Sequence, residues 1–404
     1  MTDLKPSCPS DSEVLAAFHH ELARAGQTPC LLGAGPALWP RFAAYYRSLA
    51  RLPRRMRRSL QGRWRRSLGG LALLCALGQA PTFAATIEVD GTSCTLVDAI
   101  TAANNDGPVG GCTAGSGADT IVLPANSIHT LTAVNNTADS SPNGLPPIVS
   151  TITIAGNGST ITRDPAAPDF RILLVNNGGN LTLGETTVSG GRTIQFHDGG
   201  GVANSGVLSL VNSNVVNNYS PRGGGGLHNN FSATLRLTNS AVSGNLAGFY
   251  GGGIFNRNIL TLTNSTVSGN SATQDGGGVI SRDTLTLLNS TVSANTASQF
   301  GGGLRISSGS TATLTNSTVS GNLARANGGG LNNTGTFTLT NSTVSGNSAG
   351  GNGGGVYSGG GTLTLNQTLI SGNTASSLVP SYTAKVASST ATGSTSSDTT
   401  AARA

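Results

Sequence analysis

The chain has 404 residues, of which 58 are glycine and only 10% are charged. Glycine this abundant, without the Gly-X-Y period of collagen, is typical of a low-complexity chain or of a repeat fold. Residues 1–85 hold 12 Lys and Arg against 4 Asp and Glu, whereas residues 86–404 hold 11 against 13. The basic balance therefore belongs to the N-terminal part, and we predict no nucleic-acid partner.

A secretory signal peptide is predicted at residues 56–85. The basic run RRMRRSLQGRWRR begins at Arg54, the apolar stretch LGGLALLCALGQA begins at Leu68, and small residues lead to a cleavage site after Ala84 or Ala85. These three regions, in this order, make a bacterial signal peptide. Since spanning a bilayer needs about 20 apolar residues, we expect no transmembrane segment in the mature chain.

The signal begins late, which leaves residues 1–55 to be explained. Met56 opens a complete signal peptide, so our interpretation is that translation begins there and that residues 1–55 are a non-native upstream extension. The alternative is a genuine leader, helical at Ser12–Ala25, that is removed with the signal. Export predicts a protein that is secreted or held at the bacterial cell surface or outer membrane.

Cys94 and Cys112 are the two cysteines that export would leave in the mature chain. An oxidising compartment favours a disulfide between them, which would close a small loop near the mature N-terminus. The alternative is a pair of unpaired, buried thiols.

Residues 181–376 consist of tandem repeats of roughly 25 residues. The phrase L-x-L-x-N-S-x-V-x-x-N recurs, and a second phrase, GGG followed by an aliphatic residue, keeps the same period. The first asparagine of the phrase, with Glu185 before the series and Gln367 after it, stands at Asn212, Asn239, Asn264, Asn289, Asn316 and Asn341.

Each repeat shows the period of two that is typical of β-strands. Leu260 and Leu262 point to one side, Val267 begins a second short strand, and Ile254 begins a third after the glycines. Three strands per repeat describe one coil of a β-helix, whose apolar face is buried only when coils stack. We therefore predict an all-β, right-handed parallel β-helix with eight regular coils, about 38 Å long at the usual strand spacing.

Glycine and asparagine are predicted to bend the chain at the outer corners of each coil. Glycine adopts positive φ without steric cost. The second asparagine of the phrase is expected to stack on its counterpart in the next coil, with each amide bonding its neighbour. The members of this predicted ladder are Asn218, Asn245, Asn270, Asn295, Asn322, Asn347 and Asn373.

Residues 86–180 lack the clean repeat and are predicted to form a cap and irregular first coils. Strand-like runs occur at Thr120–Leu123, Ile152–Ala155 and Arg171–Val175. A short helix is expected within Thr95–Asn104, where apolar residues recur at helical spacing and Thr95 with Asp98 resembles a capping box. This helix would cover the open end of the β-helix. Residues 377–404, rich in Ser, Thr and Ala, are predicted to be a disordered tail.

Two segments resemble known families. The run CTLVDAITAAN from Cys94, followed by DTIVLP from Asp119, resembles the N-terminal CSLREA domain of bacterial secreted and surface β-helix proteins, although Val97 replaces the Arg of the motif. The GGG-aliphatic and V-x-x-N phrases resemble repeats of chlamydial-type polymorphic outer-membrane proteins, with Val in place of Phe. The resemblance implies an exported β-helix, often at the cell surface, and carries no catalytic residues.

We predict no catalytic, cofactor-binding or metal-binding residue. Asp198 and Asp275 each precede a glycine triplet and so share a column, but three coils, or about 14 Å, would separate them. We interpret them as isolated, solvated aspartates, and His197 and His228 as exposed loop residues without a partnered nucleophile. The alternative is a polysaccharide lyase or glycoside hydrolase, because pectate lyases and polygalacturonases share this fold; such sites need clustered carboxylates and a basic residue.

The outward positions beside the repeat leucines are mostly threonine. Such a hydroxyl-lined face could order water or bind sugars or ice, although threonine is also simply a good residue for exposed strands. The candidate face comprises Thr261, Thr263, Thr286, Thr313, Thr315, Thr338 and Thr340.

Regular repeats, export and the lack of clustered reactive groups favour a structural or adhesive surface protein. Its rigid repeat face would contact cell-surface glycans, other extracellular polymers or cells. The alternatives are the polysaccharide-degrading enzyme and an ice- or glycan-binding solenoid.

Overall fold

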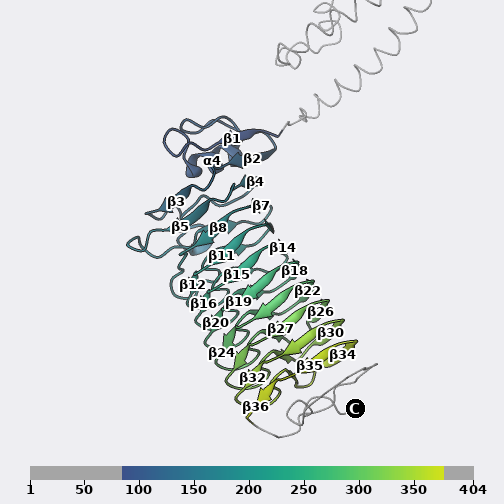
Figure 1. Ribbon diagram of the computed structural model, residues 1–404. Coiled ribbons are helices and arrows are strands. Elements are labelled where there is room, and N and C mark those ends of the chain that lie inside the picture. Colours follow the sequence, from purple (N-terminus) through teal and green to yellow (C-terminus); the bar gives the residue numbers. More distant parts are fainter. Residues whose placement is uncertain (1–83, 377–404) are drawn as a thin grey trace, which may run out of the picture. The chain divides into compact units, whose positions relative to one another are not determined.

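A computed structural model describes residues 84–376 as a parallel β-solenoid (Figure 1). The predictions for residues 1–55, for nearly all of the signal peptide and for the tail at 377–404 lie outside the described residues. Every pairing between strands is parallel, and each strand pairs with its counterparts in the coils before and after it. The predicted parallel β-helix is confirmed, while its right-handed winding stays a prediction.

The coils build four sheets, which we name A to D in chain order, and each regular coil between the first and the last contributes one strand to every sheet. One coil contains β18 (Ile259–Thr263), β19 (Thr266–Ser268), β20 (Ser271–Ala272) and β21 (Val279–Ser281). The prediction of three strands per coil was therefore wrong. The missed strands are those of sheet C, which have two residues each and are too short to show an alternating pattern.

Sheet A has 11 strands and carries the repeat leucines. Leu260 and Leu262 pair in register with Leu285 and Leu287 of the next coil, and all four are buried. Besides β18, its strands are β1 (Thr86–Glu88), β2 (Ala118–Val122), β4 (Thr151–Ala155), β7 (Asn180–Gly184), β10 (Val207–Val211), β14 (Thr234–Thr238), β22 (Thr284–Leu288), β26 (Thr311–Thr315), β30 (Thr336–Thr340) and β34 (Thr362–Asn366). The strands from β7 to β34 belong to the eight regular coils that were predicted.

Sheets B and C complete the side of each coil that follows sheet A. Sheet B buries a column of valines, of which Val267 is one, and its strands besides β19 are β3 (Ile128–Leu131), β5 (Thr160–Arg163), β8 (Thr187–Ser189), β11 (Asn214–Val216), β15 (Ala241–Ser243), β23 (Thr291–Ser293), β27 (Thr318–Ser320), β31 (Thr343–Ser345) and β35 (Leu369–Ser371). Sheet C adds β12 (Tyr219–Ser220), β16 (Leu246–Ala247), β24 (Thr296–Ala297), β28 (Leu323–Ala324), β32 (Ser348–Ala349) and β36 (Thr374–Ala375) to β20.

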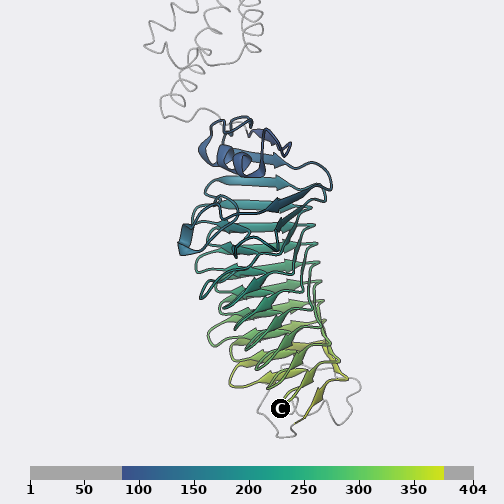
Figure 2. The same cartoon turned by 90° about the vertical axis from the view of Figure 1, so that its left-hand side faces the viewer.

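Sheet D follows the glycine triplets. Its first strand residues, such as Ile254 and Val279, are buried and close the apolar interior against the leucines and valines of sheets A and B. Besides β21, its strands are β6 (Leu173–Val175), β9 (Val202–Asn204), β13 (Leu227–Asn229), β17 (Ile254–Asn256), β25 (Leu304–Ile306), β29 (Leu331–Asn333) and β33 (Val356–Ser358). Figure 2 shows these coils stacked one upon the next.

The predicted asparagine ladder is confirmed, but it lies inside the coils. Asn245 Nδ2 donates to Asn270 Oδ1 (2.9 Å) and to the Val215 carbonyl (2.9 Å), and the Asn245 backbone N–H also donates to Asn270 Oδ1 (3.0 Å). Both asparagines are almost fully buried. The placement of these residues on the outside was therefore wrong: an amide with all its hydrogen bonds satisfied by neighbouring coils can be buried at little cost.

Two further polar columns accompany this ladder. Asn229 Nδ2 donates to Asn256 Oδ1 (2.8 Å) at the end of the sheet D strands, a buried series that the sequence analysis missed. The exposed first asparagine of the phrase makes the corner between sheets A and B, where Asn264 has a φ of +50°. Asparagine tolerates this left-handed conformation better than most residues. The prediction that asparagine bends the chain at an outer corner is therefore confirmed for the first asparagine of the phrase.

A helix and a disulfide form the N-terminal cap. Helix α4 (Leu96–Asn105) lies beside β1 and β2 at the N-terminal end of the stack (Figure 1), and it buries Leu96 and Ile100. Thr95 is its N-cap: Thr95 Oγ1 accepts from the Asp98 N–H (3.2 Å) and donates to Asp98 Oδ2 (2.7 Å), which confirms the N-cap of the predicted capping box. A 3-10 helix, η1 (Ala138–Ser140), lies in the loop between β3 and β4.

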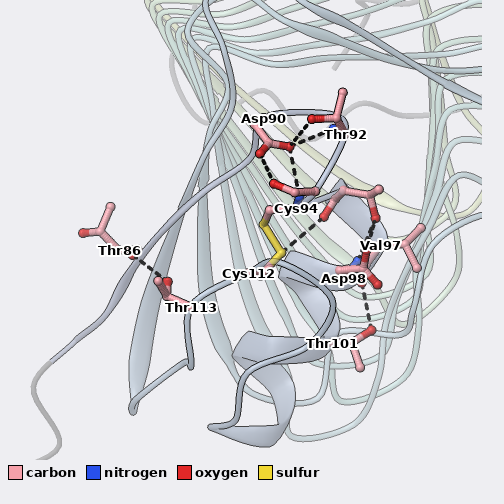
Figure 3. Close-up of a disulfide and its surroundings, with 11 residues drawn as sticks. Thr86, Asp90, Thr92, Cys94, Val97, Asp98, Thr101, Cys112 and Thr113 are labelled. Atoms are coloured by element: carbon pink, nitrogen blue, oxygen red, sulfur yellow. Dashed lines mark hydrogen bonds between the residues drawn. A yellow bond between two sulfur atoms is a disulfide. The ribbon is translucent and has the colours of Figure 1, made fainter.

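The predicted disulfide joins Cys94 to Cys112 (Figure 3). Asp90 holds the turn before Cys94, because its Oδ1 accepts the backbone N–H groups of Thr92 (2.7 Å) and Cys94 (2.9 Å). The disulfide therefore ties the loop after α4 to the turn before it. Across residues 84–376, no helix combines the length and hydropathy needed to cross a membrane.

Candidate functional site

The threonine face lies on sheet A. Thr261, Thr286, Thr313 and Thr338 stand in one column, in register on successive coils. Thr263, Thr315 and Thr340 belong to the neighbouring column, which Leu288 interrupts. All seven side chains are half-buried. Of these seven hydroxyls, only that of Thr340 has a hydrogen-bond partner within residues 84–376, the Asn366 amide. The predicted threonines thus share one face, while their binding role stays a prediction.

A second face combines arginine, aromatic and acidic side chains. It covers the outer side of sheet D and the loops before and after the strands of this sheet. We call it the arginine–aromatic face; it comprises Asp198, Arg222, His228, Phe231, Tyr250, Phe255, Arg257, Asp275, Arg282, Phe300 and Arg305. The middle residue of each short strand supplies its base, since neighbouring strand residues point inward.

Asp198 is the centre of the first part of this face. Its Oδ2 lies 3.4 Å from Arg222 Nη1, 3.9 Å from Arg257 Nη2 and 3.8 Å from His228 Nε2. Only 7% of the Asp198 side chain is exposed. Burial raises the pKa of Asp198, and the positive charges of Arg222 and Arg257 oppose this rise. The interpretation of Asp198 as an isolated, solvated aspartate was therefore wrong.

His228 was also placed wrongly in an exposed loop. It is the middle residue of β13 and is buried, with its ring centroid 5.2 Å from that of Phe255. Burial lowers its pKa well below the usual value, and the nearby arginines, Arg257 foremost, lower it further. The imidazole is therefore neutral at pH 7. His197 lies in the loop before β9, which confirms its prediction as a loop residue, but it is half-buried and not exposed as predicted.

Asp275 forms a second ion pair farther along the stack. Its Oδ2 lies 3.2 Å from Arg305 Nε, and its Oδ1 accepts the Phe300 N–H (3.2 Å). Burial raises the pKa of Asp275, and the charge of Arg305 opposes this rise. Arg305 also lies over the Phe300 ring, 5.0 Å from its centroid. The interpretation of Asp275 as a solvated aspartate was wrong for the same reason as for Asp198: an arginine of the adjoining coil covers it.

Between the two carboxylates, arginines rest on aromatic rings. The Arg257 guanidinium lies 4.6 Å from the Phe255 centroid and 4.9 Å from that of Phe231. The Arg282 guanidinium lies 5.0 Å from the Phe255 centroid and 5.3 Å from that of Tyr250. These distances are in the range of cation–π attraction. In the described part of the chain, no carboxylate lies within ion-pair distance of Arg282, so its charge is unpaired on an exposed side chain.

Three buried polar atoms of this face have no hydrogen-bond partner among the described residues: Asp198 Oδ1, His228 Nε2 and Arg257 Nε. Native structures satisfy most buried polar atoms, so three such atoms around one carboxylate mark a functional candidate rather than ordinary packing. Among residues 84–376 there is no group of three or more His, Cys, Asp and Glu side chains that could hold a metal ion. The side chains gathered on this face offer positive charges, aromatic rings and hydrogen-bonding groups.

No family model, no curated protein and no solved structure matches this chain. The likeness to the CSLREA domain and to the polymorphic repeats therefore stays a prediction from the quoted motifs.

A signal for the arginine–aromatic face was present in the sequence. The residue that follows each GGG-aliphatic phrase forms one outward column: Ala203, His228, Phe255, Ile280, Arg305, Asn332 and Tyr357. Aligning the repeats on the glycines would have shown that the residues of this column vary and that most of them are large. Such an alignment does not predict that Arg257 and Arg282 stack on Phe255. A long side chain can reach residues of several coils, so its contacts do not follow from its place in one repeat.

Proposed function

We propose that the protein is an exported, structural or adhesive β-solenoid that binds extended polymers outside the cell, such as surface glycans. The observation that carries this proposal is the arginine–aromatic face, where Arg257, Arg282 and Arg305 lie on successive coils and each rests on an aromatic ring. Parallel strands repeat every ~4.8 Å. A linear array of binding side chains suits a linear polymer better than it suits a small metabolite.

Binding is favoured over hydrolysis by the placement of the carboxylates. Glycoside hydrolases hold their two carboxyl groups about 5–9.5 Å apart. Asp198 and Asp275 stand three coils apart, which is about 14 Å at strand spacing. Each carboxylate also forms an ion pair with a different arginine, Asp198 with Arg222 and Asp275 with Arg305. This arrangement suits a binding surface better than a pair of carboxyl groups that act together as acid and base.

The threonine face is a second candidate for glycan or ice binding. Its favourable observation is the unbroken column Thr261–Thr286–Thr313–Thr338, whose hydroxyls make no hydrogen bond within the described residues. Arg236 precedes this column, and Leu288 interrupts the neighbouring one. Loss of binding on Thr261→Tyr with Thr286→Tyr, and not on substitutions of the arginine–aromatic face, would identify this face as the binding one.

The test of the proposed function has two parts. Cell fractionation of the native host, with N-terminal sequencing of the mature protein, should locate the protein outside the cytoplasm with its N-terminus near residue 85 or 86. The full chain, screened on glycan arrays with parallel activity assays on acidic polysaccharides, should bind at least one polymer without cleaving it. A cytoplasmic protein, or one that binds no polymer, contradicts the proposal.

A further inference from the structure

We propose that the arginine–aromatic face binds an anionic polysaccharide through its carboxylate or sulfate groups, with Arg282 as the principal contact. This inference rests on the proposed polymer-binding function and specifies the ligand class and the face that holds it. Four lines of observation carry it: the local charge, the unpaired guanidinium, the exposed aromatic rings and the small number of cations.

The charge of this face differs from that of the rest of the molecule. Residues 84–376 contain nine arginines and no lysine against twelve Asp and Glu, so the described part is acidic in total. Four of the nine arginines are in the arginine–aromatic face, with only two carboxylates, Asp198 and Asp275. With His228 neutral, the face carries a net positive charge on an otherwise negative surface. Such a local field attracts an anionic ligand to one face and repels it from the others.

The Arg282 guanidinium is held in place before any ligand binds, which favours the binding of an anion. Two rings, those of Tyr250 and Phe255, support its guanidinium. Within residues 84–376 no carboxylate lies within ion-pair distance of it, and Asp275 acts on it only at longer range. Stacking restricts the side chain before ligand binding, so less conformational entropy is lost when the ligand arrives. The planar guanidinium can then donate two parallel hydrogen bonds to a carboxylate or sulfate group. Arg222 belongs to the same face; its side chain is 42% exposed, and its Nη1 lies 3.4 Å from Asp198 Oδ2.

Exposed aromatic rings border these cations. Phe231, beneath Arg257, is 63% exposed, and Phe249 is 40% exposed with its ring 6.0 Å from that of Tyr250. Phe196, whose carbonyl accepts from Arg222 Nη1 (3.3 Å), is exposed as well. Large exposed aromatic side chains gathered on one surface mark a binding site, and their apolar faces suit the C–H faces of sugar rings. An acidic sugar chain offers both the anion and the apolar ring face.

Nucleic acid fits this face less well than an acidic glycan. Nucleic-acid binding gains its affinity by neutralising many phosphates, typically with six or more Lys and Arg contacts. Here two carboxylates, Asp198 and Asp275, already form ion pairs with three of the four arginines, Arg222, Arg257 and Arg305. A polysaccharide with an anionic group on some of its sugars needs fewer cations, and it uses the aromatic rings as well.

The test compares polymers that differ only in charge. The full chain would be titrated with polygalacturonate, with its neutral methyl ester, with dextran sulfate and with double-stranded DNA, and binding would be measured by affinity electrophoresis. The inference predicts tight binding of polygalacturonate or dextran sulfate, which distinguishes carboxylate from sulfate, and at least tenfold weaker binding of the methyl ester and of DNA. Arg282→Gln should weaken binding of the anionic polymer about ten- to a hundredfold, the effect of losing one charge-assisted hydrogen bond pair.

Arg236→Gln is the matched control, because Arg236 is an exposed arginine on sheet A without an ion pair among the described residues. It should leave binding unchanged, and circular dichroism should show that both variants are folded. Equal binding of polygalacturonate and its methyl ester, preferred binding of DNA, or equal losses in the two variants would overturn the inference and leave polymer binding standing. Binding of no polymer at all would overturn the proposed function itself.

Discussion

The buried asparagine ladder makes a quantitative prediction at Asn270, in the middle of the stack. The side chain of Asn270 makes four hydrogen bonds: its Oδ1 accepts from Asn245 N (3.0 Å) and Nδ2 (2.9 Å), and its Nδ2 donates to Asn295 Oδ1 (2.9 Å) and to the Val242 carbonyl (3.0 Å). Asn270→Ala removes all four. At about 1 kcal/mol for each net hydrogen bond, the free energy of unfolding should fall by about 4 kcal/mol.

The larger part of this loss comes from groups left behind in the interior. The backbone N–H of Asn245 would lose its partner while buried, and an unsatisfied buried donor costs about 1–3 kcal/mol. Because each coil of a solenoid contacts only its neighbours, the damage should be local. We expect the fastest amide hydrogen exchange in the coils on either side of Asn270, with the distant coils protected.

The assay is urea unfolding of the full chain followed by circular dichroism, combined with hydrogen exchange. The matched control is Asn264→Gly, in the same repeat, where the side chain is exposed and glycine accepts the φ of +50°. The Asn264 side chain makes two hydrogen bonds at the surface: its Nδ2 donates to Asn239 Oδ1 (3.3 Å), and its Oδ1 accepts from Asn289 Nδ2 (3.2 Å). This control should change stability by less than about 1 kcal/mol. Equal unfolding midpoints for the two variants would refute the reasoning, because the buried hydrogen bonds of Asn270 would then stabilise the protein no more than the exposed ones of Asn264.

Three further predictions concern the cap, the histidine and the glycines. Replacing Cys94 and Cys112 by Ser should lower stability by about 3 kcal/mol, the entropy of a loop of 18 residues, and hydrogen exchange should show the loss in α4 rather than in the regular coils. As the pH falls below the ordinary histidine pKa of 6.5, the unfolded chain should bind a proton at His228 that the folded chain does not bind, so stability should fall by up to about 1.4 kcal/mol per pH unit. His228→Phe should remove this slope in pH-dependent urea unfolding, and an unchanged slope would contradict a neutral, buried imidazole. Gly253→Ala should cost about 1–3 kcal/mol in thermal or urea unfolding, since a Cβ there would lie 2.8 Å from the Gly278 carbonyl and 3.0 Å from Asn270 Nδ2; wild-type stability would show that neighbouring coils can separate.

The amino-acid sequence by itself determined the repeat and most of its strands. Leu260 and Leu262 alternate with threonines, and this period of two is a property of consecutive residues. The fixed spacing of the asparagine phrase predicts that Asn245 and Asn270 stand in one column, because stacked coils place equivalent residues beside one another. The helix from Leu96 and its cap at Thr95 were likewise local patterns.

The tertiary structure alone decided which polar residues are buried. Asn270 at a corner could face either way, and it turns inward because the adjoining coils satisfy its amide. The two-residue strands of sheet C, such as β20, exist only because parallel neighbours pair with them. Asp198 and His228 are buried because arginines and aromatic rings from other coils cover them. These outcomes depend on residues one or two repeats apart, whose long side chains meet only after the coils have stacked. No pattern within one repeat contains them.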